Sequence, residues 1–225
     1  MSSAPRVTPQ QAWDTFIAGN ERFIRGESNH PNQDVERRSE LVNSQTPDVA
    51  LFGCSDSRLA AEIIFDCGLG DLFIARNMGH VVAESITASM EYAVTELGSS
   101  LIVVLAHDSC GAVAAAIDQS TREPGSVTTS VSNTLAPILP SVQQFWHRDQ
   151  HDTPYVDPAA VDANAIGRLH LGATVNELLR ASRAISDAVD RGELAIVGCQ
   201  YRLTEGRAVP YTAVGKLDIE LADPA

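Results

Sequence analysis

Five short apolar runs along the chain predict β-strands. The runs before Cys54 and His107 contain almost no polar residues, which is typical of strands that are buried on both faces of a sheet. The last run follows a Glu205-Gly206 turn and is expected to form an antiparallel edge strand. The predicted strands cover residues 49–54, 72–76, 101–106, 194–201 and 208–214.

Segments of helical periodicity lie between these runs. A helix is expected to begin at Pro9, with Thr8 as its N-cap and Gln11 closing a capping box. Ser85 is expected to cap another amphipathic helix, which ends before Gly98. The remaining helices are expected over residues 34–43, 59–65, from 111 onward, and 171–189 with an end at Gly192. Strands that alternate with helices predict an α/β fold, a mainly parallel sheet flanked by helices.

The pattern weakens between residues 120 and 166. Pro124-Gly125 and the Ser/Thr-rich stretch after it favour a loop. Residues 135–147 are expected to hold one or two short helices broken by Pro137 and Pro140. His147, His151 and nearby aspartates offer metal ligands in principle, although such residues are more often part of a solvated loop.

Three candidate metal ligands stand at or just beyond strand ends. Cys54 closes the first predicted strand, His107 follows the third, and Cys110 stands three residues beyond His107. In open α/β sheets ligands bind beyond the carboxyl ends of the strands, so two neighbouring parallel strands would bring Cys54 and His107 together. Gly111 is expected to start a helix that holds Cys110 in its first turn. Thiolate and imidazole suit Zn²⁺, and three protein ligands with an open fourth position are typical of a catalytic zinc site. The alternative, a buried cysteine pair beside a core histidine, leaves the charged neighbours unexplained.

Two segments around these ligands resemble the signature pair of the β-class carbonic anhydrases, CSDSR at 54–58 and HDSCGA at 107–112. Gln45, FIARN at 73–77 and EYAV at 91–94 also resemble that family, and the similarity covers residues 9–118 and 168–215. The resemblance implies an enzyme with one Zn²⁺ per subunit. Such an enzyme hydrates CO₂ reversibly to bicarbonate and a proton by means of zinc-bound hydroxide.

The resemblance also implies how the chain is arranged. It implies strand order 2-1-3-4, with the fifth strand at the edge, in one domain over residues 1–225 with a variable insert at 120–166. The N-terminal helical arm, residues 8–45, would reach a partner subunit in a homodimer, or in a tetramer built from dimers. From the residues alone, the first helix would instead cover the sheet of its own subunit. Its aromatic residues would be exposed if the chain stood alone.

Asp56 and Arg58 are implied to form a catalytic dyad. Arg58 would hold Asp56 off the metal, and Asp56 would accept a hydrogen bond from the zinc-bound hydroxide and orient it towards CO₂. In a closed state Asp56 would itself be the fourth zinc ligand. The residues alone also allow a helix-capping carboxylate beside a surface arginine.

The resemblance implies a substrate pocket formed by Gln45, Phe73, Met78, Tyr92 and the backbone N–H of Gly111. Gln45 matches a glutamine that enters the neighbouring subunit's site, where it would donate a hydrogen bond to a CO₂ or bicarbonate oxygen. Apolar walls suit CO₂, which is uncharged. Ordinary core packing is the alternative role for Phe73, Met78 and Tyr92.

The chain departs from part of the family at a second, inhibitory bicarbonate site. Arg76 and Tyr201 match two residues of that site, but Leu51 stands where those relatives have a tryptophan. Inhibition by bicarbonate through this site is therefore not expected.

Composition narrows the classes of partner and compartment. Hydrophobic residues make up 44% of the 225 residues, which predicts a globular protein, and the net charge of −13 disfavours nucleic acid or an anionic membrane as partners. The longest aliphatic run is too short to span a membrane, and the N-terminus lacks the apolar stretch of a signal peptide. The four cysteines form no close-set disulfide framework, which fits a reducing compartment, and Cys67 and Cys199 are expected in the core. These features favour the cytoplasm.

Two other functions stay open at this point. One is a hydrolase of CS₂ or COS, because relatives with this fold and zinc site carry out that reaction. The other is a zinc-containing regulatory protein without turnover. The Asp56–Arg58 pair argues against the second, and nothing in the motifs excludes the first.

Overall fold

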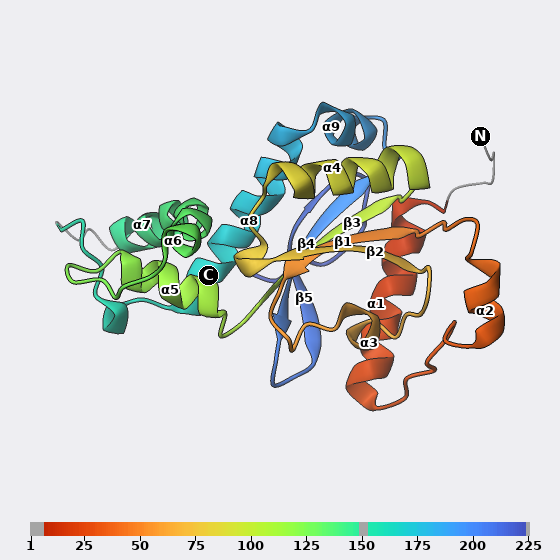
Figure 1. The fold of residues 1–225 in the computed structure, drawn as a ribbon, viewed down its shortest axis with the longest axis horizontal. Helices are drawn as coiled ribbons and strands as arrows, with labels where there is room; N and C mark the ends of the chain where they lie inside the picture. The colour runs from red at the N-terminus through yellow and green to blue at the C-terminus, as the bar shows by residue number, and fades with distance from the viewer. Residues whose placement is uncertain (1–6, 149–152, 224–225) are drawn as a thin grey trace.

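A five-stranded sheet forms the centre of the protein (Figure 1). The structure is a computed structural model that describes residues 7–148 and 153–223. The strands are β1 Val49–Cys54, β2 Leu72–Asn77, β3 Leu101–His107, β4 Ala195–Arg202 and β5 Arg207–Val214. In the order β2-β1-β3-β4-β5 the first four run parallel, and β5 is antiparallel to β4. The predicted α/β fold, strand order and antiparallel edge are confirmed.

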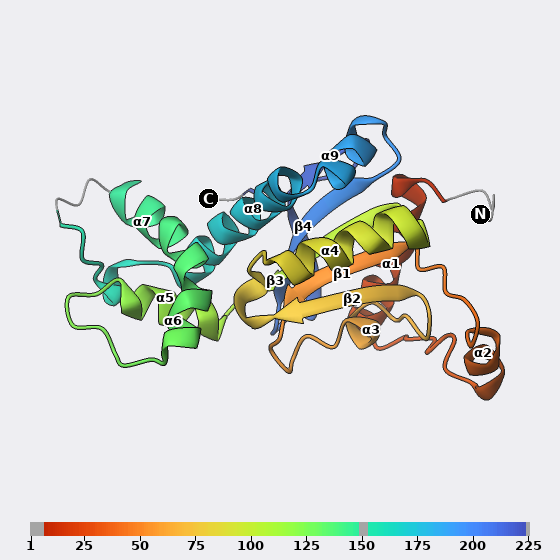
Figure 2. The ribbon, with the colours of Figure 1, turned by 45° about the horizontal axis from the view of Figure 1, so that its top comes forward.

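Helices cover both faces of the sheet (Figures 1 and 2). The α-helices of the described residues are α1 Pro9–Arg25, α2 Val35–Glu40, α3 Ala61–Ile64, α4 Glu84–Tyr92, α5 Gly111–Gln119, α6 Thr129–Leu135, α7 Leu139–Arg148, α8 Ala163–Ala181 and α9 Arg183–Asp190. Short helical turns lie at η1 Met78–His80, η2 Ala93–Leu97, η3 Ala136–Ile138 and η4 Pro158–Ala160. Both α2 and α3 are shorter than predicted. None of the helices in these ranges is long and apolar enough to cross a bilayer.

The central strands are buried along almost their whole length, which explains their unbroken apolar runs. Alternate side chains face two cores. Leu51 belongs to the core that α1, α3 and α5 cover, and Phe52 to the core that α4, α8 and α9 cover. Cys199 is fully buried as predicted, whereas Cys67 is only half-buried. One domain over residues 1–225 stays a prediction.

The first helix packs against its own subunit. Thr8 caps α1 in the predicted capping box with Gln11. Phe16 stacks on Phe65 of the same chain with ring centroids 3.7 Å apart, and Trp13 is also buried. The expectation that Trp13 and Phe16 would be exposed in a single chain is therefore wrong, because the core of the same chain covers both rings.

The helix after β2 begins one residue before its predicted cap. Ala83 occupies the N-cap position of α4 and Ser85 lies inside the first turn, so the prediction of a Ser85 cap is wrong. Glu84 opens the helix instead, where a carboxylate interacts favourably with the helix dipole. The helix continues through η2 and ends at Gly98, which has a left-handed φ of 81°, as predicted.

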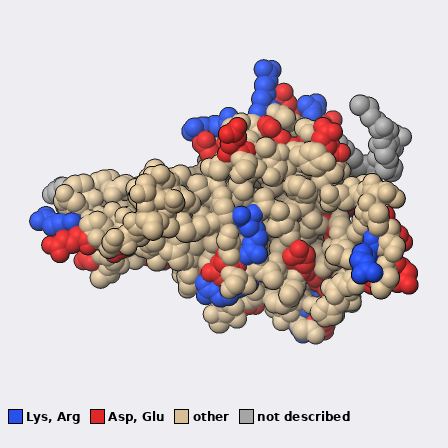
Figure 3. All heavy atoms as spheres, in the orientation of Figure 1, with Lys and Arg blue, Asp and Glu red and all other residues tan. Residues whose placement is uncertain are grey.

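Helices α5 to α7 project from one end of the sheet as a lobe (Figure 1), which shows mostly uncharged side chains on the face drawn in Figure 3. The Ser/Thr-rich stretch predicted as loop is partly helix α6, because Thr128 caps it by accepting a hydrogen bond from the Val131 N–H. The predicted interruption is present at Pro137, where the short turn η3 separates α6 from α7, whereas Pro140 lies within the start of α7. Both prolines lie in the first turns of η3 and α7, where a proline's missing N–H costs nothing. His147 lies exposed in α7, and His151 lies outside the described residues.

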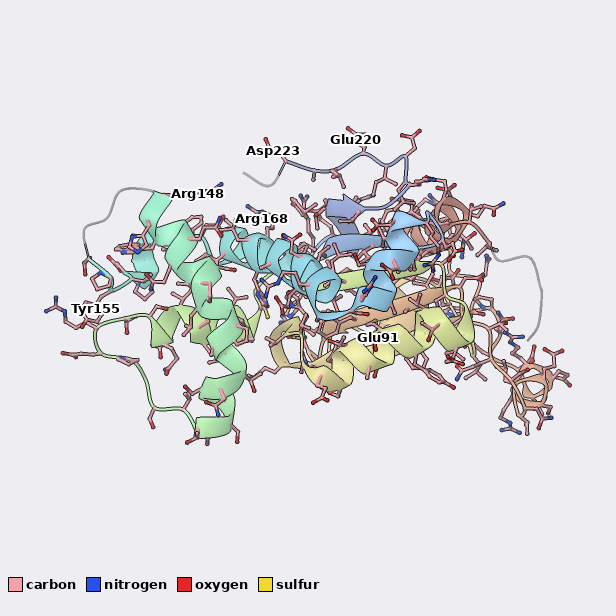
Figure 4. All side chains as sticks on the ribbon, turned by 90° about the horizontal axis from the view of Figure 1, so that it is seen from above. Glu91, Arg148, Tyr155, Arg168, Glu220 and Asp223 are labelled. Atoms are coloured by element: carbon pink, nitrogen blue, oxygen red, sulfur yellow. The ribbon has the colours of Figure 1, made fainter. Side chains whose placement is uncertain are left out.

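The last helical segment was predicted as one helix and is two. Its backbone becomes extended at Ser182, with φ −131° and ψ 111°, between α8 and α9. The Ser182 hydroxyl accepts the Ile185 N–H and donates to Glu91 at 2.5 Å. Glu91 lies on α4 (Figure 4). A serine that caps a new helix and bonds to a neighbouring helix interrupts the helix but leaves the apolar periodicity unchanged. The sequence pattern therefore does not reveal the break.

Candidate metal centre

Three potential ligands meet where β1 and β3 end and α5 begins. The sulfur atoms of Cys54 and Cys110 and a ring nitrogen of His107 all lie within 4.8 Å of one another. All three residues are buried, between 2% and 7% exposed. The strands β1 and β3 are neighbours in parallel register, so the fold brings Cys54 and His107 together as the sequence predicts.

The tautomer of His107 leaves one nitrogen directed at the cluster. Its Nδ1 lies 2.8 Å from the carbonyl oxygen of Asp108, and because a carbonyl only accepts, Nδ1 must donate. The buried Nε2 has no hydrogen-bond partner among the described residues. Leaving such a nitrogen unpaired is costly, and a metal ion would remove that cost.

The two thiols form one hydrogen-bonded pair. A hydrogen bond from the Cys110 thiol is the largest effect that lowers the pKa of Cys54, and the same contact raises the pKa of Cys110. Cys54 is therefore the thiol of the pair that ionises first. Cys110 was expected in the first turn of α5, but it is the N-cap residue instead. Its backbone is extended, and the helix starts at Gly111 as predicted.

Asp56 and Arg58 form a bidentate ion pair beside the cluster. Arg58 donates from Nε to Asp56 Oδ1 at 2.8 Å and from Nη2 to Oδ2 at 2.7 Å. These bonds hold the pKa of Asp56 well below its usual range, so the group is a carboxylate. Asp56 Oδ2 lies 3.8 Å from His107 Nε2, so the carboxylate borders the cluster while Arg58 binds both its oxygens.

Arg76 supports the loop that carries the pair. Its guanidinium donates to the carbonyl of Cys54 at 2.7 Å and also to that of Asp56. These bonds fix the backbone between the first ligand and the dyad. Leu51 is 1% exposed in the core. Arg76 is thus bound to the chain itself. The absence of a second bicarbonate site stays a prediction.

The predicted pocket residues fall into two groups. The η1 turn that contains Met78 lies against β1, β3 and α5, and Gly111 starts α5, so both lie at the end of the sheet that carries the metal cluster. Phe73 and Tyr92 lie together elsewhere, with ring centroids 6.1 Å apart. Tyr92 and Gln45 line one surface hollow.

The second group is remote from the cluster of the same chain. The register pairs Cys54 with Asn77, so Phe73 stands four residues, or about 13 Å, back along β2. Gln45 precedes Val49, which is itself about 17 Å from Cys54 along β1. Gln45, Phe73 and Tyr92 therefore cannot complete the site of the chain that carries them.

The buried polar residues behind the cluster leave no signal in the sequence pattern. Gly79 and His80 form a tight turn after β2, and His170 of α8 lies against it. A histidine on the apolar face of a helix resembles an ordinary core residue, so only the fold shows its position.

Comparisons with known proteins agree on one family. Residues 49–208 match the sequence model described as carbonic anhydrase. The chain is 41% identical to carbonic anhydrase 2 of Mycobacterium tuberculosis, over 96% of this chain and 100% of the relative. It is also 41% identical to a carbonic anhydrase of Mycolicibacterium smegmatis, over 90% and 93% of the two chains.

Similar solved structures have the same fold. A β-carbonic anhydrase of Aspergillus fumigatus matches with a TM-score of 0.67 at 24% identity, covering 88% of this chain and 89% of that one. One of two tetrameric β-carbonic anhydrases of Sordaria macrospora matches with a TM-score of 0.66 at 23% identity, covering 89% and 97%.

Proposed function

We propose that Cys54, His107 and Cys110 hold one Zn²⁺ in this chain, which belongs to the carbonic anhydrase family. It is a β-class carbonic anhydrase, an enzyme that hydrates CO₂ reversibly. The observation that carries the proposal is the buried Nε2 of His107, which has no hydrogen-bond partner among the described residues although its ring clusters with two thiols. Thiolate and imidazole donors fit Zn²⁺, whose binding would release the remaining thiol proton. Bound there, Zn²⁺ supplies a nucleophile at neutral pH by lowering the pKa of a water.

The dyad would orient the reaction. Arg58 binds both oxygens of Asp56, so the carboxylate stays ionised and fixed at the edge of the cluster. From there it can accept a hydrogen bond and so set the direction of attack on CO₂. Gly111 borders open space at the start of α5, where its N–H is available to a substrate oxygen.

We further propose that a second copy of the chain completes the pocket with its Gln45, Phe73 and Tyr92. Within one chain these residues lie far along the sheet from the metal cluster of that chain. The same surface carries exposed apolar side chains: Val42 is 76% exposed, Leu69 45% and Tyr92 itself 49%. Such a patch beside a half-buried edge strand, β2, favours a protein partner. The tetrameric relatives support a homo-oligomer.

Mixing two inactive variants tests the shared pocket. Cys54→Ser removes a ligand, and Gln45→Ala with Tyr92→Ala removes the remote half. In a mixed dimer one of the two sites would receive intact halves from both chains. Refolding the variants together at equal amounts should restore about a quarter of wild-type activity, because about half the dimers are mixed. Activity no greater than that of the variants alone would exclude a shared pocket.

Stopped-flow CO₂ hydration tests the metal proposal. Activity should fall after chelation and return with Zn²⁺, and Cys54→Ser should lose zinc and activity together, because a hydroxyl is a far poorer ligand than a thiolate. Cys199→Ser is the matched control, since Cys199 is buried in the core away from the cluster. Stoichiometric zinc with full activity in Cys54→Ser would remove Cys54 from the site.

No contact in the described residues favours a CS₂ or COS hydrolase or a regulatory protein without turnover. We propose the cytoplasm as the location. The four cysteines are unpaired, and thiolate ligands need a reducing compartment to stay available.

A further inference from the structure

The turn after β2 is held in a strained conformation behind the cluster. In η1, Gly79 and His80 both have left-handed backbones, with φ 73° and 43°. Left-handed geometry is unfavourable for a histidine and persists only where surrounding contacts impose it. His80 is also fully buried, and neither of its ring nitrogens has a hydrogen-bond partner among the described residues. The fold therefore keeps an unfavourable turn at this place.

Helix α8 holds the two carbonyl groups of that turn. His170 donates from Nε2 to the Gly79 carbonyl at 2.9 Å, and Thr174 donates from its hydroxyl to the His80 carbonyl at 3.4 Å. The two donors are four residues apart, so they lie on one face of α8. Both side chains are buried, 2% and 3% exposed. Burial lowers the pKa of the His170 ring, which stays neutral.

The turn has no room to move away from these contacts. A Cβ at Gly79 would lie 2.9 Å from Ala112 Cβ of α5 and 2.9 Å from Ile138 Cδ1 of η3. The ring of His80 packs against that of His170, with centroids 4.6 Å apart. On the far side, Asn77 bonds to both the N–H and the carbonyl of Val81. The turn is thus fixed by α8, α5, η3 and its own flank.

The turn presents a hydrogen-bond donor to the first ligand. The η1 turn lies against β1, which ends in Cys54, and the Gly79 backbone N–H bonds to the Cys54 sulfur. N–H bonds to a ligating sulfur and the residues that fix them tune metal affinity. We propose that His170 and Thr174 are positioning residues of the metal centre, which hold the η1 turn so that the Gly79 N–H bonds to the Cys54 sulfur. This inference rests on the proposed zinc site.

Two variants of nearly equal polarity separate this role from general stability. In His170→Gln the side-chain amide can reach the place of Nε2, so the bond to the Gly79 carbonyl is kept. In His170→Asn the amide stops near the place of Nδ1, and the bond is lost. Zn²⁺ affinity is measured by competition with a chromophoric chelator. The thiolate-to-metal charge-transfer band is measured with Co²⁺ in the zinc-free protein.

His170→Asn should bind Zn²⁺ about 10- to 100-fold more weakly than the wild type, the usual loss for a residue that orients a metal ligand. Its Co²⁺ charge-transfer band should move to longer wavelength, because a sulfur without its N–H donor gives up charge more easily. His170→Gln should remain close to the wild type in both measurements. Thr174→Val should shift the band in the same direction by less, since its bond is longer.

Val175→Ala is the matched control. Val175 is a buried neighbour on α8 that belongs to the core, so its loss should lower thermal stability without moving the band. A folded His170→Asn with wild-type affinity and band would overturn the proposal, as would an equal shift in Val175→Ala. If His170→Asn does not fold, an unmoved band in Thr174→Val overturns it. A wild-type protein without any thiolate band would instead refute the zinc site itself.

Discussion

Replacing Asp56 by asparagine removes the charge of the dyad while almost keeping its shape. Arg58 now binds both carboxylate oxygens, at 2.8 and 2.7 Å, and asparagine offers it only one acceptor. The side chain should therefore turn or shift beside the cluster. Misplacing an orienting group by about 1 Å costs about 100-fold in rate, so kcat/KM should fall about 100-fold, or ~2.7 kcal/mol of transition-state stabilisation.

The assay is stopped-flow CO₂ hydration on four proteins, the wild type, Asp56→Asn, Arg58→Gln and the double variant. Because the two residues touch through both oxygens, they should act as one unit, and the double variant should be no slower than Asp56→Asn. Zinc content should stay stoichiometric in all four, since neither residue belongs to the Cys54, His107 and Cys110 cluster. Losses that multiply in the double variant would refute the dyad, and so would an Asp56→Asn protein of full activity.

Two further predictions concern pH. CO₂ hydration should rise from about pH 7 to about 8.5, where water at a catalytic zinc ionises. Asp56→Asn should keep the midpoint of this rise, because the low pKa of Asp56 places the titration of that carboxyl far below it. A midpoint that moves in the variant, or a crystal structure at low pH with Asp56 on the metal, would assign the rise to Asp56. Burial would raise the pKa of Asp66, but the N–H of Asn29, the Arg22 guanidinium and the N–H of His30 lower this pKa overall. The Asp66 carboxylate therefore stabilises the fold at pH values above its unfolded pKa of about 4. That stabilisation is lost as the pH falls through the folded pKa. In thermal melts, Asp66→Asn should thus be clearly less stable than the wild type at pH 7 and nearly equal at the lowest pH where both fold, and an unchanged difference would contradict this.

The sequence predicts the sheet and the metal cluster well because both depend on local patterns that few other folds produce. An apolar run that ends in Cys54, and another that ends before His107, define two strands and place their ligands at one edge. Even the order of strands followed once the family was known. The Asp56–Arg58 pair was within reach because its members are two residues apart.

What the sequence could not predict depends on contacts between distant elements. Ser182 interrupts the last helix because Glu91, 91 residues away, accepts its hydroxyl. The aromatic face of α1 looked exposed because its cover, Phe65, comes later in the chain. His170 lies 91 residues from Gly79, and no spacing rule connects them. The separation of Gln45 from Cys54 likewise follows from strand length and register.

In the dimer that we propose, that separation has a consequence for how the two sites behave. Strand β1 ends in Cys54, which would bind the metal of one site, and begins four residues after Gln45, which would contact substrate in the other. A fully buried, close-packed strand transmits strain, so β1 would couple the two sites of that dimer. A shift of the substrate-binding side of one pocket would then shift the metal-binding side of the other. Substrate binding in one pocket of such a dimer would therefore change the affinity of the other pocket for substrate.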